Sequence, residues 1–158
     1  MKKLAPILSL ALLYIITSCS QPVVDGQQIN TKAALPASLN FKQACPFVIT
    51  SMINRKQGTM STLYGNDAAR NALLGKAQPN NGEVLALVTW KQQEDPHWFG
   101  GLIPGKLVSV EWAKTQNDQN HSFVYQRFDG ASLQPHNDTT GNSSRLHYIS
   151  ILRPSVMP

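Results

Sequence analysis

The sequence is poor in cysteine, with only two in 158 residues, at positions 19 and 45. Cys19 ends an apolar, signal-like stretch at the N-terminus, which leaves Cys45 as the only cysteine in the body of the chain. One cysteine cannot form an internal disulfide or supply a metal site built from several thiolates. Because Cys45 stands beside Pro46 and an apolar run, we predict that it is a buried small hydrophobic residue and not a nucleophile.

Clustered charge is lacking as well. The chain has 14 basic and 9 acidic residues, and removal of a signal containing Lys2 and Lys3 would leave 12 basic residues and a net charge of +3. The remaining basic residues are scattered, with Arg55 and Lys56 as the one adjacent pair. Nucleic-acid binding needs a clustered basic face, so we exclude nucleic acid as a partner.

Catalytic signatures are also missing, and there is no Gly-x-Ser-x-Gly elbow. Gly100, Gly105 and Lys106 have the spacing of a phosphate-binding loop. However, Leu107 follows where magnesium binding needs a hydroxyl, and a strand is expected next instead of a helix N-terminus. We therefore reject a phosphate loop and predict no catalytic residue.

The N-terminal stretch has the features of a bacterial lipoprotein signal. A basic start is followed by an apolar segment, residues 4–16, that is too short to span a bilayer comfortably. The sequence Ile-Thr-Ser-Cys at 16–19 then resembles a lipobox. We predict that residues 1–18 are a signal peptide and that Cys19 carries the lipid. The mature protein would then be firmly tethered to a membrane.

Ser20 follows this cysteine, and in the enterobacterial sorting pattern a serine there favours the outer membrane. We therefore expect a lipoprotein of the bacterial cell envelope that faces the periplasm. Residues 19–40 are polar, with short side chains and no sustained periodicity, so we expect a lipidated N-terminus and flexible tether. The folded domain is predicted to span residues 41–158.

Periodicity within that domain predicts an α+β fold with a mainly antiparallel five-stranded sheet and one or two short helices. Residues 65–76 are predicted to form a helix, with Asn66 as its N-cap and Gly75 as its stop. The predicted strands lie in runs that alternate or are continuously apolar, bounded by turn residues: 47–53, 83–90, 107–114, 122–128 and 146–152.

The long connection between the second and third of these strands contains the sequence DPHWFGGLIPGK. It spans residues 91–106, sixteen in all, which is longer than most connections. Trp98 and Phe99 would be costly to leave in water. We therefore expect them to fold back over one end of the sheet, as an aromatic lid above a core or a pocket.

Four histidines are the remaining candidates for a site. His121 lies in a polar turn, and His147 lies in a predicted strand. His97 and His136 lie in predicted loops, where ligand contacts concentrate.

Several blocks from residue 59 onward resemble the bacterial cytochrome P-460 family. They are TMSTLYGNDAARNAL, GEVLALVTWKQQEDPHWFGGLIPG, VSVEWAK, VYQRFDG and the terminal RPSVMP. The resemblance covers residues 45–158. It implies an antiparallel sheet with helices packed around a haem, which in well-known members is of c-type and cross-linked to a lysine. Such proteins oxidise hydroxylamine or bind nitric oxide.

This sequence departs from the family at the residues that hold the haem. It has no Cys-x-x-Cys-His motif, and no cysteine follows Cys45. The strand expected to carry the cross-linking lysine is apolar, and Lys91 comes only after its end. Covalent c-type haem is therefore excluded. By the resemblance, a non-covalent haem would take His136 as its proximal ligand, with Trp98 and Phe99 as walls of the cavity.

Two main interpretations follow for the function. In the first, the domain binds haem or another small ligand non-covalently, with nitric oxide or a related nitrogen oxide as the natural ligand by resemblance. In the second, a haem-free lipoprotein binds a protein or envelope partner through its sheet surface. A small hydrolase is a third, and it requires a carboxylate or hydroxyl within hydrogen-bond reach of His97 or His136. A cavity with His136 pointing inward would favour the first interpretation, and a filled core with His136 in solvent the second.

Overall fold

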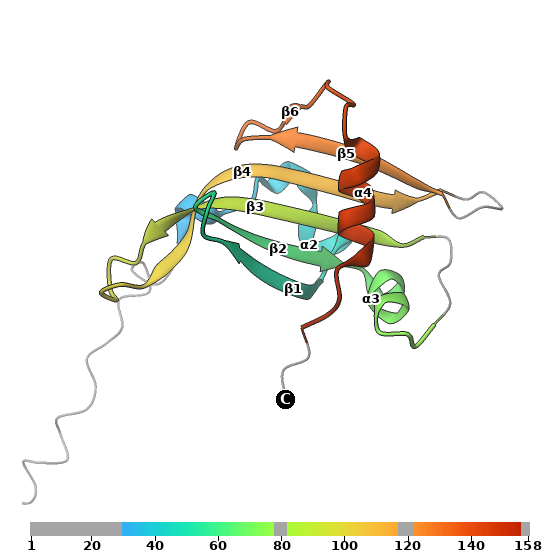
Figure 1. The fold of residues 1–158 in the computed structure, drawn as a ribbon, viewed down its shortest axis with the longest axis horizontal. Coiled ribbons are helices and arrows are strands. Elements are labelled where there is room, and N and C mark those ends of the chain that lie inside the picture. The colour runs from blue at the N-terminus through green and yellow to red at the C-terminus, as the bar shows by residue number, and fades with distance from the viewer. Residues whose placement is uncertain (1–29, 78–81, 117–121, 156–158) are drawn as a thin grey trace, which may run out of the picture.

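A computed structural model describes residues 30–77, 82–116 and 122–155 of the chain (Figure 1). Its centre is a six-stranded antiparallel sheet in which each strand pairs with its neighbours in sequence, in the order β1-β2-β3-β4-β5-β6. The strands are β1 (Phe47–Asn54), β2 (Thr59–Gly65), β3 (Val84–Glu94), β4 (Leu102–Thr115), β5 (Phe123–Asp129) and β6 (Gln134–Pro135). The helices are η2 (Thr31–Ala33), η3 (Ala37–Leu39), α2 (Phe41–Ala44), α3 (Asp67–Leu73) and α4 (Asn142–Ile151).

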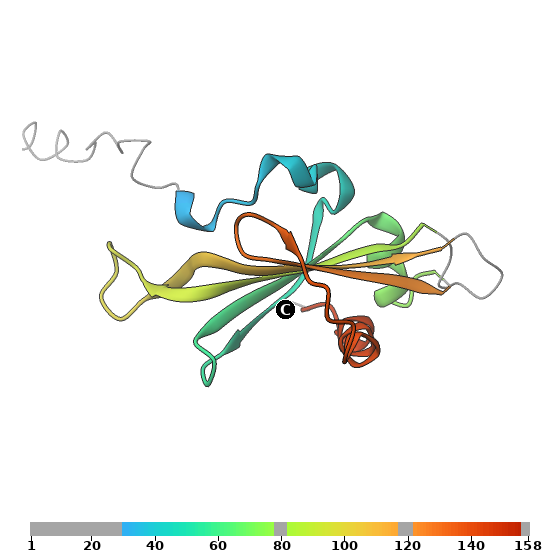
Figure 2. The same cartoon turned by 90° about the horizontal axis from the view of Figure 1, so that it is seen from above.

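The helices cover opposite faces of the sheet. Viewed along the sheet, the segment with η2, η3 and α2 lies on one side and α4 lies on the other (Figure 2). Successive side chains of a strand point to opposite faces, so the continuously apolar strand β3 supplies both cores at once. Both faces of the sheet are therefore filled by packed side chains.

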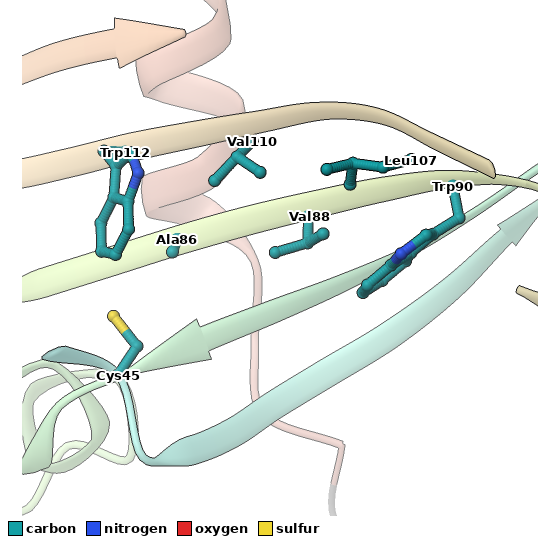
Figure 3. Packing of buried hydrophobic residues seen from close by; sticks show 7 residues of the cluster. All are labelled: Cys45, Ala86, Val88, Trp90, Leu107, Val110 and Trp112. Atoms are coloured by element: carbon teal, nitrogen blue, oxygen red, sulfur yellow. The ribbon is translucent and has the colours of Figure 1, made fainter. Parts of the chain in front are cut away.

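The first core lies under the N-terminal segment (Figure 3). Its buried members come from β3, β4 and the end of α2: Cys45, Ala86, Val88, Trp90, Leu107, Val110 and Trp112. Ala33, Leu35 and Leu39 pack against this cluster, and Trp90 Nε1 donates a hydrogen bond of 3.0 Å to the Ala33 carbonyl. Residues 30–40 are thus part of the packed domain, so the predicted boundary at residue 41 lies too late in the chain.

The second core lies under α4 and beside α3. Its buried members are Ile49, Leu63, Ala69, Leu85, Leu87, Ala113 and Ile149. Helix α3 begins as predicted: the Ala69 amide donates a 3.0 Å hydrogen bond to Asn66 Oδ1, which caps the first turn. The Asn66 side chain also accepts from the Val84 amide, so the cap fixes the helix to the start of β3.

The α+β class and the antiparallel sheet are confirmed, but the count of elements differs. The sheet has six strands instead of five, since β2 and the two-residue β6 were not predicted, and three short α-helices are described instead of one or two. The predicted strand 146–152 is wrong, because residues 142–151 form α4. Leu146 and Ile149 are three residues apart on this helix and both contact the second core, which makes a helical turn the better packed form.

Candidate functional site

His97, Trp98 and Phe99 lie at the tip of the β3–β4 hairpin. Strands β3 and β4 stay paired as far as Glu94 and Leu102, so the connecting loop is shorter than the sixteen residues expected. Trp98 is 75% exposed and Phe99 is 105% exposed. The predicted aromatic lid is therefore wrong, because both side chains are exposed to solvent instead of folding back over the sheet.

The register of the sheet explains why the tip of the hairpin lies beyond the sheet instead of covering it. Strand β2 pairs with β3 only as far as Lys91, and β5 pairs with β4 only from Ser109 onward. The hairpin therefore extends past both neighbouring strands, as Figure 1 shows at the left. The loop is nevertheless ordered by internal hydrogen bonds, including one from the His97 amide to Asp95 Oδ1 of 2.8 Å.

His136 lies at the β6 edge of the sheet, directly after that strand. It is exposed, and its Nδ1 lies 2.7 Å from Asp129 Oδ2, while Arg127 Nε donates to Asp129 Oδ1 over 2.8 Å. Burial acts to raise the pKa of Asp129, but the hydrogen bonds from Arg127 and His136 outweigh it and lower that pKa. The predicted haem ligand is thus held by a hydrogen bond to Asp129 at the surface, and the structure does not bring it together with the hairpin residues.

The pairing of His136 with Asp129 meets one requirement of the hydrolase interpretation. A hydrolase of this type also needs a nucleophile beside the histidine. Among the described residues, no serine, threonine or cysteine side chain is hydrogen-bonded to His136. Asp129 is also paired with Arg127, so in the present structure its carboxylate is shared between a surface ion pair and the His136 hydrogen bond.

A groove lies between the N-terminal segment and Tyr64 of β2, and none of the predicted site residues lines it. Its volume is about 750 Å³, and it is lined mostly by apolar side chains, within the size range of ligand pockets. The lining residues are Leu35, Pro36, Ala37, Asn40, Phe41, Lys42, Gln43 and Tyr64. The sequence predicts a flexible tether over residues 19–40 and so does not reveal this site, although the apolar residues at 35, 39 and 41 are a signal for it.

Phe41 fixes the floor of the groove to the sheet. Its ring meets Tyr64 of β2 edge-on at 4.8 Å and Trp112 of β4 at 5.6 Å between centroids. Asn40 turns the chain between η3 and α2 with a left-handed backbone, at φ 45°. Asparagine is one of the few residues that adopt this conformation readily. The turn places α2 and its Lys42 along one side of the groove.

The side chains of the groove do not fit a haem. Its donors are the Lys42 amine, the amides of Asn40 and Gln43, and the Tyr64 phenol, and no histidine, cysteine or methionine is among the lining residues. Burial raises the pKa of Tyr64, which disfavours the phenolate form that ligates haem iron. The exposed His136 lies elsewhere on the sheet, after β6.

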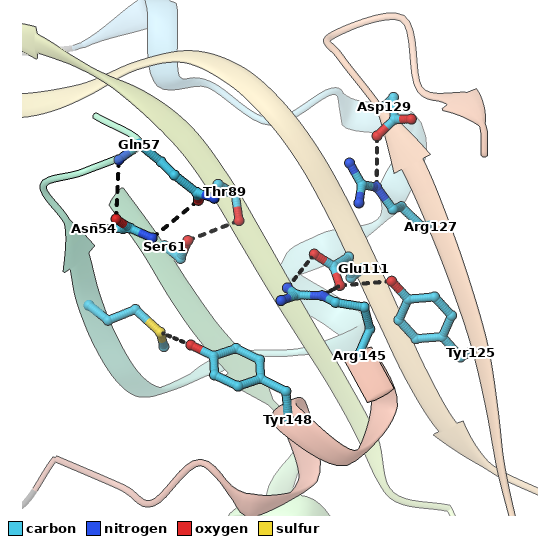
Figure 4. A network of polar contacts seen from close by, with 11 residues as sticks. Asn54, Gln57, Ser61, Thr89, Glu111, Tyr125, Arg127, Asp129, Arg145 and Tyr148 are labelled. Atoms are coloured by element: carbon cyan, nitrogen blue, oxygen red, sulfur yellow. Dashed lines mark hydrogen bonds and ion pairs between the residues drawn. The ribbon is translucent and has the colours of Figure 1, made fainter. Parts of the chain in front are cut away.

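A polar network lies on the opposite face, beneath α4 (Figure 4). Glu111 of β4 is only 2% exposed, and Arg145 of α4 binds both of its carboxylate oxygens, with Nε at 3.0 Å and Nη2 at 2.8 Å. The Tyr125 hydroxyl donates to the same carboxylate over 2.7 Å. Burial and this carboxylate raise the pKa of Tyr125 well above its usual value. The network satisfies a buried charge and joins α4 to the sheet.

Cys45 is buried, as predicted, with its thiol 3.8 Å from the Val84 carbonyl. Burial raises the pKa of this thiol to about 12, which suits a structural residue and not a nucleophile.

Within the described ranges, no group of three or more histidine, cysteine or acidic side chains is placed to hold a metal ion. No helix of those ranges is long and apolar enough to cross a membrane. No protein-family model matches the chain, and no curated protein matches it.

Proposed function

We propose that this protein is a lipid-anchored protein of the bacterial cell envelope whose domain binds a small, mostly apolar ligand non-covalently in the groove between residues 35–43 and Tyr64. The observation that carries this proposal is the groove itself, with its volume of about 750 Å³ and its apolar lining. The lipobox-like sequence ending at Cys19 supports the anchor, and the resemblance to the cytochrome P-460 family supports a domain built to hold a small ligand.

The geometry favours an organic ligand over haem. Haem binding depended on His136 pointing into a cavity, whereas both cores are filled and His136 is exposed and hydrogen-bonded to Asp129, which favours a haem-free protein. Lys42 offers a cation at the side of a groove whose surface is mostly apolar. This combination suits an amphiphile with an apolar body and one anionic group, since the body is removed from water while the charge stays at the rim.

A titration with 1-anilinonaphthalene-8-sulfonate, an anionic aromatic fluorophore, tests the proposal. We expect saturable binding to the folded mature chain and about two- to fivefold weaker binding in Lys42→Gln, the effect of one exposed charge pair. Lys76→Gln, a matched change at an exposed lysine beyond α3, should leave the affinity unchanged. If both variants bind the fluorophore with the parent's affinity, Lys42 does not contact the ligand. The absence of saturable binding would contradict the proposal.

Hemin separates the two ligand classes. We expect no Soret shift that depends on a histidine, so His136→Ala should give the same absorption spectrum in a hemin titration as the parent protein. A Soret band that is lost in His136→Ala would restore the haem interpretation and place its site at the β6 edge.

A further inference from the structure

The hairpin end of the domain presents apolar side chains directly to solvent. Trp98 and Phe99 are exposed at the tip, and Leu102 beside them is 49% exposed. The internal hydrogen bonds of the loop, such as that from the Gly101 amide to the Trp98 carbonyl of 2.9 Å, hold the tip in one shape. Large adjacent apolar side chains that are exposed in this way often mark an interaction surface.

The described chain enters the fold beside this same hairpin. The Asn30 side chain donates a 2.5 Å hydrogen bond to the Pro104 carbonyl, and η2 packs against β4. Cys19 lies eleven residues before Asn30. Eleven residues reach about 40 Å at most when fully extended. A lipid on Cys19 would therefore hold the hairpin end within about 40 Å of the bilayer.

Positive charge also gathers at this end of the molecule. The β1–β2 turn lies against the hairpin, since the Gln92 amide donates to the Gly58 carbonyl and Lys91 Nζ donates to the Gln57 carbonyl. This end of the molecule has two acidic residues, Glu94 and Asp95. Its five basic residues are all exposed: Lys32, Arg55, Lys56, Lys91 and Lys106. Such a surface is electrostatically complementary to a membrane that contains anionic phospholipids.

We propose that the hairpin is a second membrane contact, in which Trp98 and Phe99 enter the bilayer interface while the surrounding cations bind phospholipid headgroups. Tryptophan is favoured at that interface because its ring is apolar and its N–H still reaches water. The orientation of the domain on the membrane rests on the proposed lipid at Cys19. The contact of Trp98 and Phe99 with the bilayer does not depend on that lipid. A protein partner is the competing occupant of the tip.

Tryptophan fluorescence can report on the tip because the other two tryptophans, Trp90 and Trp112, are each 5% exposed. The mature lipidated protein is reconstituted in vesicles of phosphatidylcholine and phosphatidylglycerol with brominated acyl chains, which quench fluorescence on contact. We expect quenching that is lost in Trp98→Phe. The matched control, Trp98→Phe with Val124→Trp, moves the exposed tryptophan to the opposite end of the sheet, and its emission should stay unquenched.

The same vesicles mixed with unlipidated mature chain test the hairpin contact separately from the lipid anchor at Cys19. We expect binding that is at least about tenfold weaker in Trp98→Ala/Phe99→Ala and also weaker at high salt. If mass spectrometry finds no lipid on Cys19 while Trp98 is still quenched, the anchor fails and the membrane contact stands. Unquenched Trp98 in lipidated protein would overturn the contact, and a protein cross-linked to position 99 in cells would then identify the competing occupant.

Discussion

At the scale of single residues, Glu111 shows how a charge is accommodated inside this small domain. An unpaired carboxylate at 2% exposure would be costly, but Arg145 and Tyr125 together satisfy both of its oxygens. Because Arg145 comes from α4 and Tyr125 from β5, the pairing specifies where α4 lies on the sheet. The alternating strand pattern around Glu111 predicted its strand but not its burial, since its partners lie 14 and 34 residues away in sequence.

We expect Arg145→Ala to lower the free energy of unfolding by about 2–3 kcal/mol, because it leaves a buried carboxylate with a single donor. This is below the usual cost of breaking a buried pair, since Arg145 itself is 40% exposed. Arg127→Ala breaks an exposed pair with Asp129 and should cost about 1 kcal/mol or less. Chemical denaturation of both variants measures the difference, and equal losses would contradict the stabilising role of the buried pair.

Cys45 supplies a prediction about pH and reactivity. Its thiol should resist alkylation in the folded protein and react once denaturant is added, because burial raises its pKa to about 12. The unfolded thiol ionises at a lower pH than the folded one. Stability from this group is therefore complete below about pH 9 and is lost as the pH rises toward 12.

Denaturation at several alkaline pH values measures this loss. Cys45→Ala should show a shallower fall in unfolding free energy over that range, by up to about 1.4 kcal/mol per pH unit. Parallel curves for the parent and the variant would show that the thiol is accessible to water in the folded state.

At the scale of elements, features set by local sequence signals are predicted correctly. Features set by contacts between distant residues are not. The Asn66 cap and the apolar run of β3 are local, and the structure confirms both elements. The segment 146–152 alternates like a strand, but contacts of Leu146 and Ile149 with distant residues make it helical. The exposure of Trp98 and Phe99 follows from unequal strand lengths, which no local pattern reveals.

The N-terminal segment gives the clearest prediction at this scale. A chain that begins at residue 41 lacks the hydrogen bond from Trp90 to Ala33 and the packing of Leu35 and Leu39 on the first core. We expect it to be about 2–4 kcal/mol less stable than a chain that begins at residue 30. Guanidinium unfolding of the two chains measures this, and equal midpoints would show that residues 30–40 do not belong to the domain.

At the scale of the whole molecule, we propose separate roles for the groove and the hairpin. The groove lies on the face covered by the N-terminal segment, and the hairpin lies at the end of the sheet where that segment begins. A membrane contact through the hairpin would leave the groove open toward the periplasm. The domain would then be a fixed platform that holds a small ligand near the membrane surface.

Filling the groove is the most direct test of this account. Ala37 is exposed and lines the groove, whereas Ala131 is exposed in the turn before β6. We expect Ala37→Trp to abolish saturable binding of the anionic fluorophore and Ala131→Trp to preserve it, with both variants unfolding cooperatively at the parent's midpoint. If Ala37→Trp binds the fluorophore with the parent's affinity, the groove is not the ligand site and the proposed function is contradicted.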